Sequence, residues 1–158
     1  MHSTQPVTCR LNLTSADQCV LEHAASIISK QFVQSDVFTS VDLVKQFLSC
    51  KLATQQREVF SVMLLTNQHH LISYQELFYG TIDGASIYPR EVVKLCLQSN
   101  AAAVIFAHNH PSGVTEPSSA DKQITQRLKS ALGLVDIRVL DHFIVGANCF
   151  SMAEHGMV

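Results

Sequence analysis

A short apolar segment that runs directly into two histidines constrains the fold of this chain more than any other feature. Ala101–Ala107 contains only small or apolar residues and is followed by the letters HNHP. Its length and its Val, Ile and Phe content favour a buried strand. Alternate residues of a strand point to the same side, so His108 and His110 share one side. Pro111 and Gly113 prevent the strand from continuing, which places both imidazoles at its carboxyl end.

A helix start follows shortly after the second histidine. Ser118 comes directly after Pro117 and is typical of the residue that caps a helix. Asp121 then falls in the first helical turn, where the positive end of the helix dipole favours a carboxylate. Two imidazoles and one carboxylate that converge in this way leave a zinc ion a fourth position for water. On the residue pattern alone, this zinc site and ordinary structural roles for the three side chains both stand.

The same segment, HNHPSGVTEPSSAD, together with LDHFIVG further along the chain, resembles the signature of the RadC-like family. That family belongs to the JAMM (MPN+) metalloprotease superfamily, whose pattern is a distant Glu, then His-x-His, seven residues, Ser, two residues and Asp. His108, His110, Ser118 and Asp121 match this spacing without a gap, and the resemblance covers residues 56–152. It implies a single α/β domain whose mixed β-sheet is flanked by helices in a cytidine-deaminase-like layout.

The resemblance also implies a role for each matching side chain. His108, His110 and Asp121 are expected to bind Zn²⁺, and Ser118 to donate a hydrogen bond to the oxyanion that forms on an attacked carbonyl. Ser118 is in addition expected to cap the helix that contains Asp121, and the two roles do not compete.

The implied reaction needs a base as well as a metal. Zinc lowers the pKa of bound water toward about 7, and a carboxylate that is not a ligand then moves the proton to the leaving amine. The family pattern matches this base to Glu58, within QREVF. Without that pattern Glu58 is an ordinary charge at a strand end. Its rivals are Glu76, on the neighbouring strand, and Glu91, which the helix dipole alone explains.

Other polar residues have two interpretations each. Asp141 and His142 lie in the middle of a predicted strand, either as an internally satisfied polar pair or as groups that orient a ligand or line the cleft. We interpret Asn109 as a turn residue between the two ligands. His69 and His70 are interpreted as solvated residues of a hairpin connection and not as metal ligands.

Periodicity predicts two leading helices and then the order β-β-α-β-α-β-β. Residues 1–55 are expected to form an N-terminal helical segment packed on the domain, and residues 56–158 the MPN (JAMM/RadC-like) metal-binding domain. The predicted strands cover residues 58–65, 71–78, 101–107, 137–145 and 149–152. Full-length RadC-like proteins often carry a helix-hairpin-helix region, but no glycine of such a hairpin occurs before Gly80.

The composition of the chain limits the classes of function that it can have. A chain of 158 residues with 47% hydrophobic and 15% charged residues suits one compact domain. The net charge of −2 provides no basic field for nucleic acid. The N-terminus lacks a signal-peptide pattern and no run is long enough to cross a membrane. The five cysteines are widely spaced without a C-x-x-C pair, which predicts reduced thiols and a cytoplasmic protein.

Two functions follow from these observations. The favoured one is a zinc-dependent metallo-hydrolase that acts on a peptide or isopeptide substrate by means of a metal-activated water. The other is a DNA-repair-associated RadC-like accessory protein whose metal site is structural or acts on another substrate. The charge balance argues against nucleic-acid binding, and the sequence predicts neither the substrate nor the oligomeric state.

Overall fold

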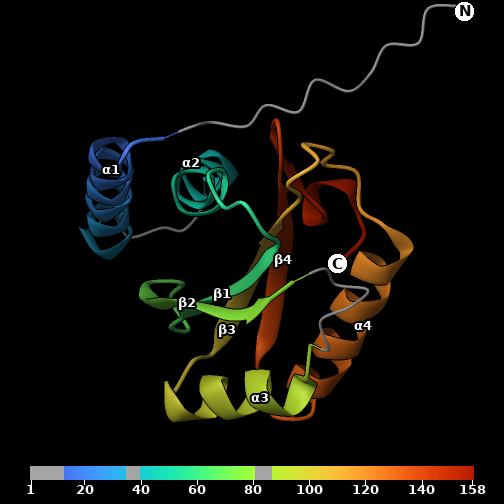
Figure 1. The fold of residues 1–158 in the computed structure, drawn as a ribbon. Coiled ribbons are helices and arrows are strands. Elements are labelled where there is room, and N and C mark those ends of the chain that lie inside the picture. Colours follow the sequence, from blue (N-terminus) through green and yellow to red (C-terminus); the bar gives the residue numbers. More distant parts are fainter. Residues whose placement is uncertain (1–12, 35–39, 81–86) are drawn as a thin grey trace, which may run out of the picture.

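The computed structural model describes residues 13–34, 40–80 and 87–158, and in them a five-stranded sheet in the order β2-β1-β3-β4-β5 is flanked by helices (Figure 1). The elements are α1 (Ser15–Gln34), α2 (Val41–Leu52), β1 (Val59–Leu65), β2 (Leu71–Tyr79), α3 (Pro89–Gln98), β3 (Ala103–Asn109), α4 (Ser119–Gly133), β4 (Arg138–Val145), β5 (Cys149–Ser151) and the 3₁₀ helix η1 (Ala153–His155). The predicted α/β fold and its order of elements are confirmed.

The pairing of the strands brings residues that are distant in the sequence to the same end of the sheet. β1 pairs antiparallel with both β2 and β3, whereas β3 and β4 run parallel, so the sheet is mixed as predicted. Phe60 near the start of β1 lies opposite His108 near the end of β3. Glu58, which directly precedes β1, therefore enters the sheet at the end where β3 leaves it.

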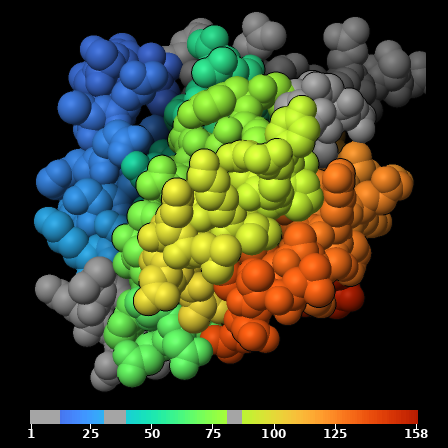
Figure 2. All heavy atoms as spheres, turned by 90° about the horizontal axis from the view of Figure 1, so that it is seen from below, coloured from blue at the N-terminus to red at the C-terminus, as the bar shows by residue number. Residues whose placement is uncertain are grey.

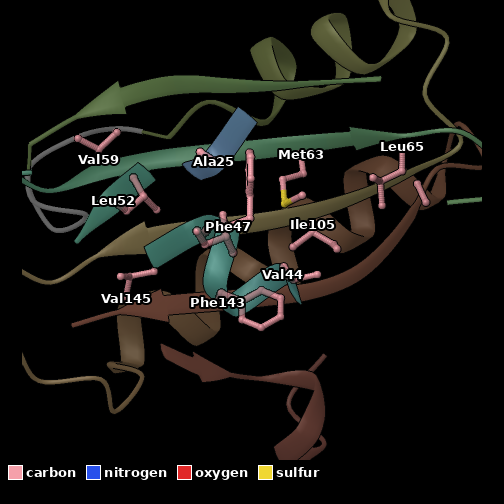
Figure 3. Packing of buried hydrophobic residues seen from close by; sticks show 13 residues of the cluster. Ala25, Val44, Phe47, Leu52, Val59, Met63, Leu65, Ile105, Phe143 and Val145 are labelled. Atoms are coloured by element: carbon pink, nitrogen blue, oxygen red, sulfur yellow. The ribbon is translucent and has the colours of Figure 1, made fainter. Parts of the chain in front are cut away.

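Both faces of the central strands are covered, which explains why β1 and β3 are buried at every position. On one face, α2 packs against alternate residues of β1, β3 and β4 (Figure 3). On the other face, a second cluster joins β1 and β3 to α3 and α4. These two helices adjoin each other on the molecular surface (Figure 2). The sheet is thus packed on both faces, and the site residues lie at one end of its central strands.

The N-terminal helices differ in how deeply they are buried. α2 places Val44, Phe47, Leu48 and Leu52 in the core, whereas α1 packs mainly on α2 and contributes the buried Ala25. The division at residues 55 and 56 stays a prediction.

The described cysteines, Cys19, Cys50, Cys96 and Cys149, are free, as expected, and Cys9 lies outside the described residues. Within the described part of the chain, no helix has the length and apolarity needed to span a membrane.

The packing of α2 yields a stability prediction. Leu48 is fully buried between α2 and the sheet, so Leu48→Ala should lower the free energy of unfolding by about 2–5 kcal/mol through lost burial and the cavity left behind. Leu97 in α3 is 56% exposed, and Leu97→Ala should change that free energy by less than about 0.5 kcal/mol. Urea denaturation of both variants measures the difference. Equal effects would show that α2 is not part of the core.

Candidate metal centre

The three predicted metal ligands meet where β3 ends and α4 begins. His108 is fully buried within β3, and His110 lies one residue beyond the strand. Their Nε2 atoms are 2.9 Å apart. Asp121, in the first turn of α4 and 1% exposed, places Oδ1 3.2 Å from His108 Nε2 and Oδ2 3.7 Å from His110 Nε2. The strand end and the helix start thus bring the three side chains together.

Glu58, the residue directly before β1, lies beside the two histidines, in a group that does not include Asp121. In the described part of the chain, one group of potential ligand atoms lies within 4.8 Å of one another, and it consists of Glu58, His108 and His110. Neither rival carboxylate belongs to it. Glu76 on β2 contacts the hydroxyls of two tyrosines, and Glu91 pairs with its exposed neighbour on α3. The antiparallel pairing of β1 with β3 explains why Glu58 is the carboxylate beside the histidines.

Ser118 and Asp121 form a capping box at the start of α4. The Ser118 hydroxyl donates to Asp121 Oδ2 at 2.7 Å and accepts from the Asp121 amide at 3.1 Å. The Ser118 amide also donates to Oδ2, at 2.8 Å. The predicted capping role is confirmed, whereas the oxyanion role stays a prediction. Because Oδ2 is occupied by the cap, the carboxylate is oriented with Oδ1 toward His108.

Asp121 Oδ1 is buried and accepts no hydrogen bond from the described residues. Burial raises the pKa of this carboxyl, but the neighbouring His108 and the hydrogen bonds from Ser118 lower it by more, so the net shift is downward. The side chain is therefore an anion with one unpartnered oxygen. A buried polar atom without a partner is costly, and a bound cation would remove that cost.

His108 and His110 are also suited to bind a cation. His110 Nδ1 lies 2.7 Å from the Val114 carbonyl oxygen, which can only accept, so the hydrogen-bond pattern assigns the proton to Nδ1. In the neutral ring, Nε2 then carries a lone pair that faces His108. Burial lowers the pKa of His108, which favours its neutral form as well. Two imidazole nitrogens and a carboxylate oxygen are a donor set that binds zinc in catalytic sites.

Asp141 and His142, in the LDHFIVG segment, differ in their hydrogen-bond partners. Asp141 accepts hydrogen bonds from the amides of His142 and Ala153 and from the Ser151 hydroxyl. Burial raises the pKa of Asp141, and these three bonds oppose the rise. It is thus an internally satisfied polar group. His142 instead reaches the candidate centre, because its Nε2 lies 2.8 Å from His108 Nδ1.

The structure corrects the prediction that Asn109 is a turn residue. Asn109 is instead the last residue of β3, and it is 2% exposed. Its Oδ1 accepts from the Val59 amide at 2.8 Å, and its Nδ2 donates to the carbonyls of Arg57 at 3.0 Å and Gln55 at 3.3 Å. β3 extends past His108 because Asn109 pairs with Val145 of β4, while the Asn109 side chain bonds to the main chain that leads into β1. The side chain thereby fixes the segment that carries Glu58.

His69 and His70 lie at the opposite end of β1 from this cluster. His69 and His70 connect β1 to β2, as predicted, and His69 Nε2 contacts Arg138 Nη2 at 3.2 Å. Neither belongs to the ligand group found among the described residues.

Gly146 allows the loop after β3 to pack against the β4–β5 turn. A Cβ atom there would lie 2.6 Å from the Gly113 carbonyl oxygen and 2.8 Å from Thr115 Cγ2. The adjacent Ala147 amide donates to that same Gly113 carbonyl at 3.0 Å. This loop supplies the Val114 carbonyl that orients His110, so the glycine supports the site through its lack of a side chain.

This close approach predicts the effect of an added methyl group. Gly146→Ala should displace the loop, lower the free energy of unfolding by about 1–3 kcal/mol and weaken metal binding through His110. Gly133→Ala is the matched control, because its Cβ would meet nothing within 4 Å. Thermal unfolding and zinc titration of both variants measure these effects. Wild-type behaviour of Gly146→Ala would show that the loop does not depend on this contact.

Comparison with known proteins agrees with this geometry. Residues 38–157 match the RadC-like JAB domain family. A UPF0758 protein of Vibrio cholerae serotype O1 is 57% identical over 137 residues, which are 87% of each chain. A UPF0758 protein of Marinomonas sp. (strain MWYL1) is 56% identical over 142 residues, which are 89% of this chain and 63% of the relative. The chain therefore belongs to the RadC-like JAB domain family.

Proposed function

We propose that this domain is a zinc-dependent hydrolase of amide or isopeptide bonds. The observation that carries the proposal is the buried, unpartnered Oδ1 of Asp121, which faces His108 Nε2 at 3.2 Å beside the carboxylate of Glu58. Family membership supports a metal-dependent hydrolase in general. The substrate class and the metal are our inference from the donor set and from the nearby base.

Each side chain has a separate role in this proposal. His108, His110 and Asp121 would hold the metal, which when bound supplies Lewis acidity and lowers the pKa of water to about 7. The Glu58 carboxylate takes a proton from the attacking water and transfers it to the leaving nitrogen. The Ser118 hydroxyl turns from Asp121 Oδ2 toward the substrate and donates to the oxygen on which charge develops.

If the chain is instead a DNA-associated accessory protein with a structural metal, Glu58 has a different role. A structural zinc site is closed by four protein ligands, so Glu58 would have to be the fourth ligand. The net charge of −2 gives no support to nucleic-acid binding. A cytoplasmic location is part of the proposal, supported by the free state of the described cysteines.

Two variants separate metal binding from chemistry. Asp121→Ala should lose zinc, because it deletes the charged ligand. Glu58→Gln should keep zinc but lose about 10²–10⁴-fold in turnover, because an amide cannot carry the proton. Zinc content is measured by elemental analysis, and turnover with fluorogenic peptide and isopeptide libraries. Glu91→Gln, at an exposed position of α3, is the control and should match wild type. Loss of zinc in Glu58→Gln with retention in Asp121→Ala would reverse the assigned roles.

Ser118→Ala separates the cap from the oxyanion role. Loss of the observed cap should lower the free energy of unfolding by about 1 kcal/mol. Loss of an oxyanion donor should lower turnover by about 10²–10³-fold while zinc is retained. We expect both effects in the same preparation. Ser119→Ala, one residue further along, is the control. Near-normal turnover beside a lowered melting temperature would limit Ser118 to its structural role.

A further inference from the structure

Glu58 lies just beyond the paired part of the central strands. The register of β1 with β3 ends at Phe60 and His108, two residues after Glu58. The Glu58 carbonyl accepts a hydrogen bond from the Gly80 amide at 2.9 Å, which joins it to the end of β2. The position of Glu58 relative to β3, the strand that leads into both candidate histidines, therefore depends on contacts outside that register.

The Asn109 side chain supplies these contacts. Its Oδ1 accepts from the Val59 amide, and its Nδ2 donates to the carbonyls of Arg57 and Gln55. The main chain is thus bonded to one side chain both before and after Glu58. Asn109 is buried, so loss of its amide would leave main-chain groups without these partners. Because Asn109 stands between the two histidines in the sequence, it connects the backbone of the base directly to that of the candidate ligands.

This connection matters because Glu58 lies close enough to become a ligand itself. Its carboxylate oxygen and the ligand nitrogens of His108 and His110 lie within 4.8 Å of one another. Two ligands of a tetrahedral zinc ion are about 3.4 Å apart, so a movement of roughly 1 Å brings the carboxylate into coordination. A fourth protein ligand would close the position that a catalytic zinc site keeps open for water.

We propose that Asn109 is a positioning residue that keeps the Glu58 carboxylate beside the metal as a base and prevents it from closing the site as a fourth ligand. The proposal rests on the proposed function, because it places the metal on His108, His110 and Asp121. Both polar atoms of the Asn109 side chain are bonded to main chain, so Asn109 acts through the backbone of Glu58 and is not a ligand.

Truncation of the Asn109 side chain should release the segment that contains Glu58. The carboxylate is then free to move toward the divalent cation, which attracts it strongly in a site of low dielectric constant. A residue with a merely structural role has a different signature, since its loss would lower stability and weaken metal binding without adding a ligand. The two interpretations therefore predict opposite changes in zinc affinity.

The test uses the full chain loaded with Co²⁺, whose visible spectrum reports its ligands, and azide as a small anion that enters an open coordination position. The wild-type spectrum should change when azide is added. Asn109→Ala should lose this response and should bind zinc at least as tightly as wild type in competition with a chelating dye. The double variant Asn109→Ala with Glu58→Gln lacks the charged fourth ligand and should regain the response to azide.

Ser61→Ala is the matched control. Ser61 is also buried, and its hydroxyl donates to the Ala107 carbonyl of β3 at 3.1 Å, which joins the same two strands away from Glu58. This variant should have a lower melting temperature than wild type but the same azide response.

Asn109→Thr keeps the test decisive if Asn109→Ala does not fold. A β-branched residue suits a strand, but its single hydroxyl cannot replace three hydrogen bonds, so this variant should also lose the azide response. Retention of the response in the folded Asn109 variants, or weaker zinc binding by them, would overturn the proposal. A wild-type protein without any response would overturn it together with the open site of the proposed function. The expected responses without hydrolysis of any peptide would count against the proposed function alone.

Discussion

The antiparallel pairing of β1 with β3 is the constraint on which the site depends. It sets Phe60 opposite His108, so that a carboxylate preceding one strand meets the imidazoles at the end of the other. The Asn109 side chain holds this end of the pair by three hydrogen bonds to the main chain of residues 55–59. A shift of register would separate the Asn109 side chain from its main-chain partners and move Glu58 away from the histidines. The position of Glu58 therefore follows from the sheet itself.

The centre brings several hydrogen-bond acceptors together around the buried His108 and Asp121. The capping box uses one oxygen of Asp121 and leaves the other toward His108, while the loop carbonyl of Val114 directs the lone pair of His110 to the same point. Such a group of acceptors is unfavourable in the absence of a cation, and the fold maintains it through the core around it. This cost is typical of a functional site, where local stability is given up for binding. The same geometry explains how a helix cap can also orient a metal ligand.

Much of this arrangement could be predicted from the sequence. The apolar run before His108, the turn residues after His110 and the helix start at Ser118 predicted the elements and the convergence of the candidate ligands. The role of Asn109 was predicted wrongly because it depends on contacts between neighbouring strands. A polar residue inside an apolar strand is a signal of such a contact but does not name its partner. The two interpretations of Asp141 and His142 also required the structure, since adjacent strand residues face opposite sides.

The central claim is that the chain binds a metal through two histidines and Asp121, with Glu58 beside the metal as the general base and not as a ligand. Anomalous diffraction at the zinc edge, from crystals of the zinc-loaded protein, tests it most directly. The account predicts one zinc per chain with His108 Nε2, His110 Nε2 and Asp121 Oδ1 at about 2.0–2.2 Å and the fourth position open to solvent. Direct coordination by Glu58 in a closed site, or no anomalous peak after saturation with zinc, would contradict it.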